Sequence, residues 1–197
     1  MAKRTVYLHV GPAVPGVTAL HEALRAHPAL VAAGVTLPTV DQADLDRADV
    51  EIRRRHKAVG VRRKDVEGAW ARVCRKAYKA RGDVLISQPG FLDADPEQVA
   101  LAVDGLVGMR LHLIVTPNVA PHDVSPVDLV GPWAAHVKKD ERIHVLPVGD
   151  DPTVDAVGVA LAKVVLEARE AEVERRLLKL TKQRRKIRER LNRVDAA

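Results

Sequence analysis

Residues 7–20 decide the fold, and they read YLHVGPAVPGVTAL. The apolar run up to Val10 predicts a buried strand, and the residues after the glycine-containing turn predict the start of a helix. A turn between a strand and a helix presents backbone N–H groups to a phosphate. This turn, from Gly11 to Thr18, contains no lysine or arginine. The sequence therefore predicts a phosphate-loop geometry from which the usual cation is missing.

Apolar runs elsewhere in the chain predict further buried parallel strands, with helices between them. The expected strands are residues 5–10, 83–87, 111–116 and 142–148, with 34–38 as a weaker fifth. An N-cap residue followed by proline marks three helix starts, at Asp95-Pro96, Ser125-Pro126 and Asp151-Pro152. Strands that alternate with helices indicate an α/β fold with a mainly parallel sheet flanked by helices.

The charge-rich residues 41–80 predict helix as well. Their expected inward positions are Ile52, Val59, Val66, Trp70, Val73 and Ala77. The basic runs 53–55 and 62–64 are interpreted as solvated helix faces, because acidic residues flank both.

Cysteine usage and the absence of a long apolar segment indicate the compartment. Cys74 is the only cysteine among 197 residues, so no internal disulfide is possible. No apolar segment is long enough for export or for spanning a membrane. The sequence therefore predicts a cytoplasmic protein.

The basic character of the chain lies in its C-terminal segment. The formal net charge is +6, and residues 181–193 hold seven cations and one anion, Glu189, so the other residues sum to zero. The seven cations are Lys182, Arg184, Arg185, Lys186, Arg188, Arg190 and Arg193.

A helical pattern without interruption runs through residues 152–193. A helix of this length measures roughly 60 Å, whereas a compact domain of 150 residues is about 40 Å across. We therefore expect an α/β domain at residues 1–150 and, at 151–197, a long helix that its domain covers only in part. The positions expected to pack on the domain are Val157, Leu161, Val164 and Val165.

The rest of this helix carries an apolar stripe with alternating steps of four and three residues, which is expected to pack against a partner copy, another protein or a flap of its own domain. The stripe consists of Val173, Leu177, Leu180, Ile187, Leu191 and Val194, and Arg184 interrupts it. One interpretation is association with a second copy or with another protein. The residues expected to make that contact are Leu177, Leu180, Lys182, Arg184, Arg185, Lys186, Ile187, Arg188 and Leu191. Sequence-independent binding of nucleic acid through the cations is a second, and a solvated terminal helix a third. Attachment to an anionic membrane surface would lack tryptophan or phenylalanine anchors.

The strand–turn–helix stretch, followed by the segment 33–38, resembles the start of bacterial sulfotransferase-family proteins. These transfer a sulfuryl group from 3′-phosphoadenosine 5′-phosphosulfate (PAPS), and their loop typically runs Gly-Leu-Pro-Lys-Thr-Gly-Thr-Thr. The present loop keeps Gly11, Gly16 and Thr18, but the lysine position of the family holds Val14. Residues 83–88 and 113–118 also resemble family strands. There the position of an arginine for the 3′-phosphate of the donor holds Asn118, and Ser125 lies near the place of a family serine.

Loss of the two cations has a predictable cost for donor binding. Charge-assisted hydrogen bonds contribute roughly 1.5–3 kcal/mol each, so the two replacements together cost about 3–6 kcal/mol, or two to four decades of affinity. Residual binding of PAPS, or of its product 3′-phosphoadenosine 5′-phosphate (PAP), would then rest on Gly11, Gly16, Val17 and Thr18. We expect no resident cofactor.

No set of residues in the sequence has the spacing of a catalytic or metal site. His9 is expected to be a satisfied core histidine rather than a base, and His21 a surface residue. Asp93 and Asp95 are interpreted as a loop residue and a helix cap. No catalytic residue and no metal ligand is assigned.

The sequence thus favours a sulfotransferase-like protein that has lost its catalysis and acts through assembly or partner binding by its C-terminal helix. Two alternatives stay open. One is an active PAPS-dependent sulfotransferase for a small molecule or glycan, with cations supplied from elsewhere, such as Arg62 or Arg63. The other is sequence-independent nucleic-acid binding through the basic segment.

Overall fold

The computed structural model describes residues 3–195 except 12–13, 15–16, 117–129, 138 and 147–152. Four strands form one sheet with the order β2-β1-β3-β4, in which every pair is parallel. The strands are β1 (Thr5–Val10), β2 (Val84–Ser87), β3 (Arg110–Val115) and β4 (Ile143–Val145). The predicted α/β class with a parallel sheet is confirmed, with each strand inside or within one residue of its expected range.

The weak fifth strand, residues 34–38, is not part of the sheet ladder. Only Thr36 forms a bridge, to Val84, the first residue of β2. Gly34 has a left-handed φ of 64°, and Pro38 carries no N–H, so neither end of this segment can extend a ladder.

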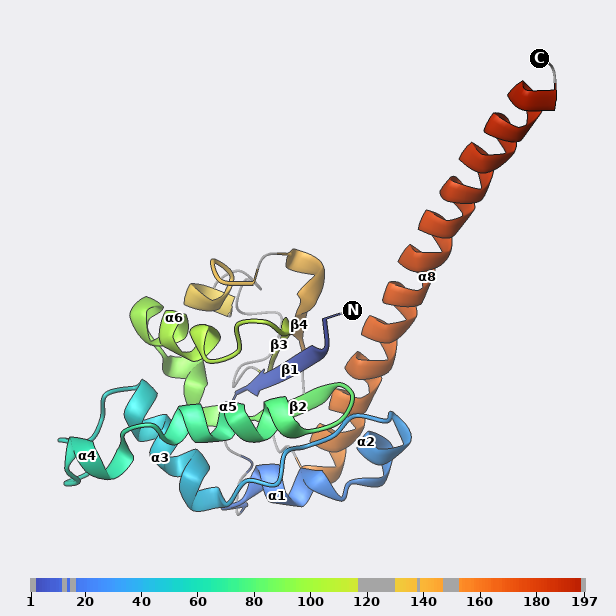
Figure 1. Ribbon diagram of the computed structural model, residues 1–197. Coiled ribbons are helices and arrows are strands. Elements are labelled where there is room, and N and C mark those ends of the chain that lie inside the picture. The colour runs from blue at the N-terminus through green and yellow to red at the C-terminus, as the bar shows by residue number, and fades with distance from the viewer. Residues whose placement is uncertain are drawn as a thin grey trace.

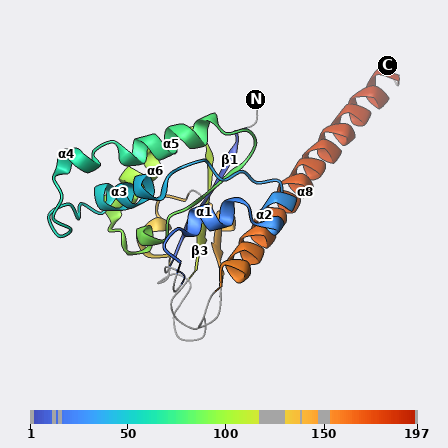
Figure 2. The ribbon, with the colours of Figure 1, turned by 90° about the horizontal axis from the view of Figure 1, so that it is seen from below.

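Helices cover both faces of the sheet (Figures 1 and 2). On one face lie α1 (Leu20–Arg25), α2 (Pro28–Ala32) and α8 (Val154–Asp195), which share a buried core with alternate residues of the sheet such as Tyr7 and Ile114. On the other face lie α3 (Gln42–Ile52), α5 (Ala69–Lys79) and α6 (Pro96–Asp104), whose core includes Leu8. Short 3-10 turns are η1 (Pro89–Asp93), η2 (Gly131–Trp133) and η3 (Asp140–Arg142).

Residues 41–80 form three helices rather than one, because the short α4 (Arg63–Val66) stands between α3 and α5. Arg54 and Gly60 have left-handed φ angles of 54° and 71°, which end the α-helical geometry between α3 and α4. Val59 lies in this turn and is 44% exposed, so its predicted inward position is wrong. The other five predicted positions are buried.

The predicted start of α6 is confirmed: the Asp95 carboxylate accepts from the Gln98 N–H at 2.9 Å, and the Gln98 side chain accepts from the Asp95 N–H at 3.2 Å. The predicted starts at Ser125-Pro126 and Asp151-Pro152 lie outside the described residues. The described part of α8 begins at Val154, and the Thr153 hydroxyl accepts from the Ala156 N–H at 3.1 Å.

Helix α8 is 42 residues long and leaves the domain as a projecting rod (Figure 1). Its first part is buried, with Val157, Leu161, Val164 and Val165 in the core beside α1 and α2, as predicted. From Arg176 to Arg193 every side chain is exposed. The predicted long C-terminal helix, covered by its domain only in part, is confirmed.

Candidate functional site

Two backbone N–H groups of the loop after β1 donate to carbonyls of the protein itself. The Gly11 N–H donates to the Pro89 carbonyl at 3.3 Å, and the Val17 N–H donates to the Val14 carbonyl at 3.0 Å. A Cβ at Gly11 would lie 1.7 Å from Thr116 Oγ1, so glycine is required here by the close approach of Thr116, the residue that follows β3. These two amides are therefore not free to bind an anion.

Two other residues of this loop, Val14 and Thr18, differ in burial. Val14, at the lysine position of the resembling family, is 4% exposed and packs in the core with α1 and α8. Thr18 is exposed. Gly16 and Asn118 lie outside the described residues. Helix α1 has only six residues, no side-chain cap, and Glu22 in its first turn, so its N-terminus adds little attraction for an anion.

His9 lies at the carboxyl end of β1 in a closed hydrogen-bond network. Its Nδ1 is 2.9 Å from Ser87 Oγ, and its Nε2 is 3.0 Å from Thr116 Oγ1. Burial lowers the pKa of His9 to about 4, so the ring is neutral at pH 7. The prediction of a satisfied core histidine is confirmed.

His21 is buried, and its predicted place at the surface is wrong. Its Nε2 donates to the Pro38 carbonyl at 3.0 Å, and its Nδ1 accepts from the Ser87 N–H at 3.2 Å. The sequence did hold a signal, because His21 follows Leu20 and stands three positions before Leu24, on the inward face of α1.

A cleft of about 350 Å³ opens at this carboxyl edge, where open α/β sheets bind ligands. Thr18, His21 and Ser87 line it together with Asp46, Asp49 and Arg55. Its charged lining thus comprises two aspartates and one arginine, a balance that disfavours a doubly anionic donor.

Asp49 sits tightly at the cleft wall, since a Cβ at Gly90 would lie 2.2 Å from Asp49 Oδ1. Burial raises the pKa of Asp49, while Arg53 and Arg55 oppose that rise. The sequence missed the two aspartates, although Asp46 and Asp49 stand three positions apart on one face of α3.

Neither arginine suggested as a replacement cation is in this cleft. Arg62 pairs with Asp65, with Nε 2.9 Å from Oδ2. Arg63 lines a different cleft, of about 730 Å³, beside Trp70 and Leu101.

Helix α8 presents the other set of predicted site residues. Leu177, Leu180, Ile187 and Leu191 are each more than half exposed. The cations among residues 182–193 are exposed too, and within the described part of that segment one ion pair is present, between Arg185 and Glu189 at 3.5 Å. The structure thus places the apolar stripe and the basic residues together on one projecting rod (Figure 1).

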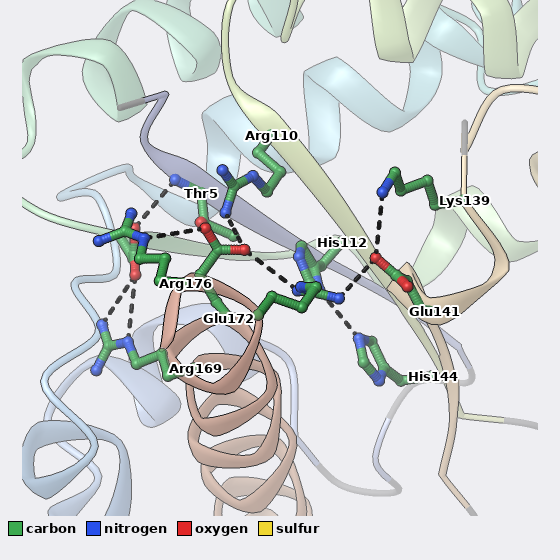
Figure 3. Close-up of polar contacts among 11 residues, drawn as sticks. Thr5, Arg110, His112, Lys139, Glu141, His144, Arg169, Glu172 and Arg176 are labelled. Atoms are coloured by element: carbon green, nitrogen blue, oxygen red, sulfur yellow. Dashed lines mark hydrogen bonds and ion pairs between the residues drawn. The ribbon is translucent and has the colours of Figure 1, made fainter. Parts of the chain in front are cut away.

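A group of ion pairs holds α8 where it leaves the domain (Figure 3). We call it the neck cluster; its centre is Glu172, whose carboxylate lies 3.1 Å from Arg110 Nη1, 3.2 Å from Arg175 Nη2 and 3.3 Å from Arg176 Nε. Arg175 also pairs with Glu141 at 2.6 Å. Burial alone would raise the pKa of Glu172, but Arg110 and Arg175 hold this pKa below its ordinary value.

Two further contacts lie beside the neck cluster. The Arg169 guanidinium pairs with Asp83 at 3.2 Å and donates to the Gly34 carbonyl at 3.0 Å. His112 Nδ1 lies 3.1 Å from His144 Nε2. The pKa of His112 is lowered to about 3, mainly by burial and further by the nearby His144 and arginines. Helix α8 is thus held by ion pairs to Asp83, just before β2, to Arg110 of β3 and to Glu141 of η3, which sequence reasoning missed.

Comparison of the chain with protein-family models, with curated proteins and with solved structures finds no match. Among the helices that the structure describes, none combines the length and apolar character needed to cross a membrane. The described histidine, cysteine, aspartate and glutamate side chains include no group of three that could hold a metal ion. The resemblance to sulfotransferases therefore rests on the loop and strand residues alone.

Proposed function

We propose that this protein is a catalytically inactive, sulfotransferase-like α/β domain that works by assembly, through pairing of the projecting half of α8 with another helix. The observation that carries the proposal is the row of four large apolar side chains left exposed on that half: Leu177, Leu180, Ile187 and Leu191. Covering side chains that are more than half exposed contributes about 1 kcal/mol each, so a matching helix would be held by several kcal/mol.

The carboxyl edge of the sheet supports the loss of catalysis. Sulfuryl transfer needs cations that neutralise charge on the donor. Instead, Val14 is buried, the Gly11 and Val17 amides are used within the protein, and the cleft holds two aspartates against one arginine.

Calorimetry with PAP tests this half of the proposal. We expect no heat of binding at micromolar nucleotide. A micromolar dissociation constant would contradict the loss of the donor site and would favour an active PAPS-dependent enzyme.

Sedimentation equilibrium tests the assembly. We expect the wild-type chain to associate and the double variant Leu177→Asp, Leu180→Asp to remain at the mass of one chain, because two carboxylates in the seam would have to be desolvated. The control is Leu178→Asp, which places one carboxylate on an equally exposed leucine beside the stripe. Wild type and double variant of equal mass would discard assembly through the stripe.

A second candidate function, sequence-independent nucleic-acid binding, is favoured by one observation: the exposed cations of residues 182–193, with the single ion pair Arg185–Glu189 in that described segment. Such binding would weaken steeply with salt, with a slope of about −5 to −6. We expect gel retardation at low salt to disappear when residues 181–197 are deleted. If the full chain shows no retardation, this candidate is wrong.

A further inference from the structure

The apolar stripe of α8 extends beyond its projecting half, into the part attached to the domain. Val159, Leu166, Val173, Leu180 and Ile187 follow one another at intervals of seven residues, and each is more than half exposed. Val159 and Leu166 are thus left uncovered by the domain that buries their neighbours. A seven-residue apolar repeat is the pattern of a coiled-coil seam.

A second column completes the seam, four residues after each member of the first. In coiled-coil notation the first column occupies the d positions, and the second occupies the a positions. The a column reads Lys163, Glu170, Leu177, Arg184 and Leu191. Three of its five residues are charged, so the seam is apolar in one column and mixed in the other.

The domain packs against the side of α8 opposite to this seam. The apolar residues of α8 buried against the domain are Val157, Leu161, Ala162, Val164, Val165 and Ala168. Five of them fall on the b, c and f positions, whose mean direction lies about 180° around the helix from the a and d positions, and Ala162 falls on the g position beside the seam. The a and d residues from Val159 to Leu191 are all exposed. The seam is therefore unobstructed from Val159 to Leu191, a length of about 50 Å at 1.5 Å per residue.

Resting on the proposed assembly, we propose that the occupant of this seam is α8 of a second copy, lying antiparallel. In a parallel pair in register, Lys163, Glu170 and Arg184 would each face its own copy inside the seam, and two segments of charge +6 would lie side by side. Like charges in such layers are destabilising, and charged a positions set the orientation of coiled coils.

The antiparallel pair removes these conflicts. With Val173 opposite the partner's Leu177, Glu170 faces the partner's Leu180, and Arg184 faces the partner's Leu166. The acidic stretch 167–174, which holds four glutamates and one arginine, then lies opposite the partner's residues 176–183, which hold three cations. The basic residues 182–193 face the partner's residues 157–168, which hold one lysine and one glutamate, instead of their own copy. One helix thus carries both halves of a complementary charge pattern, which favours a second copy as the partner.

The length of the seam is sufficient for a stable pair. Two helical strips about 50 Å long and about 10 Å wide bury on the order of 1,000 Å² in total, which reaches the size of a specific interface. Because each domain sits on the outer side of its helix, the pairing leaves the two domains at opposite ends of the rod.

Single-cysteine variants test the orientation. The native Cys74 can stay, because it is buried and burial raises the pKa of its thiol to about 12, so it does not react. Glu170→Cys and Leu180→Cys are prepared separately, one with a tag that changes its mass. Each is treated with a short bis-maleimide alone and after mixing with the other under reducing conditions.

In the mixture we expect a cross-linked dimer that contains one chain of each variant. Its yield should be at least tenfold higher than the yield of cross-linked dimer from either variant alone. In the antiparallel pair, like cysteines stand about 15 Å apart along the axis, whereas unlike ones face each other. Cross-linking of Leu180→Cys alone, on a chain that sediments as a dimer, would overturn the antiparallel orientation and leave the assembly standing. A wild-type chain that stays at the mass of one chain would overturn both.

Discussion

The carboxyl edge of the sheet and the projecting half of α8 differ in how far their groups are already satisfied within the chain. At the sheet edge, both ring nitrogens of His9 and of His21 have partners, and the Gly11 and Val17 amides donate to carbonyls of the same protein. On α8, large apolar side chains such as Leu180 and Ile187 stay mostly exposed. The polar groups named at the sheet edge are thus used within the protein, beside the cleft that opens there, whereas the apolar side chains of the projecting half of α8 are left uncovered.

The largest expected effect is a difference in unfolding free energy between substitutions on the two sides of α8. Leu161→Ala, in the core, should lower the free energy of unfolding by about 2–5 kcal/mol, because it leaves a cavity. Leu180→Ala, on the seam, should lower it by less than about 0.5 kcal/mol in the monomer. Chemical denaturation at a protein concentration low enough to dissociate any oligomer makes this comparison. Equal losses for the two variants would mean that Leu180 packs on its own domain.

The second effect probes the closed network at the sheet edge through pH. Unfolded His9 takes up a proton near its ordinary pKa of 6.5, whereas folded His9 does so only near 4. Stability from neutral His9 is therefore fully present above pH 6.5 and is lost as the pH falls toward 4, by about 3 kcal/mol. Unfolding free energies measured between pH 7.5 and 4.5 give the slope.

The variant His9→Gln provides the control for that slope. We expect it to be less stable at pH 7.5 but to lose less stability on acidification. Some slope should remain, because burial also lowers the pKa values of His21 and His112. A slope unchanged by the substitution would mean that His9 is open to solvent protons.

The smallest effect concerns the neck cluster, between the two regions. Glu172→Gln removes the charge shared by Arg110, Arg175 and Arg176 and should cost about 1 kcal/mol or less, because the cluster is partly exposed and screened. Amide hydrogen exchange of residues 169–176 should become faster. Glu174→Gln, an exposed neighbour, should change nothing. Equal exchange in the two variants would show that packing alone holds this part of α8.

The fold was predictable where sequence patterns are local. The apolar run Thr5–Val10 predicts its strand because both faces of a parallel sheet are covered. The cap at Asp95 predicts the start of α6 because its partner Gln98 is three residues away. The break after α3 was not predictable, since a left-handed Arg54 carries no sequence signature of the kind that glycine or proline gives.

The candidate sites were predictable only in part, for the same reason. The stripe on α8 follows from its spacing, and the missing lysine follows from reading Val14. The neck cluster joins Arg110 to Glu172, and the cleft joins Asp49 to the far end of β2. Such contacts between segments far apart in the chain depend on the tertiary fold, and no local pattern contains them.

The mass of the wild-type chain in solution tests the central claim most directly. Sedimentation equilibrium between 1 and 100 μM covers about two decades around the micromolar affinity expected of a seam of this size. The proposed assembly predicts a concentration-dependent approach to twice the chain mass of 21.5 kDa. A mass of 21.5 kDa at every concentration would contradict it.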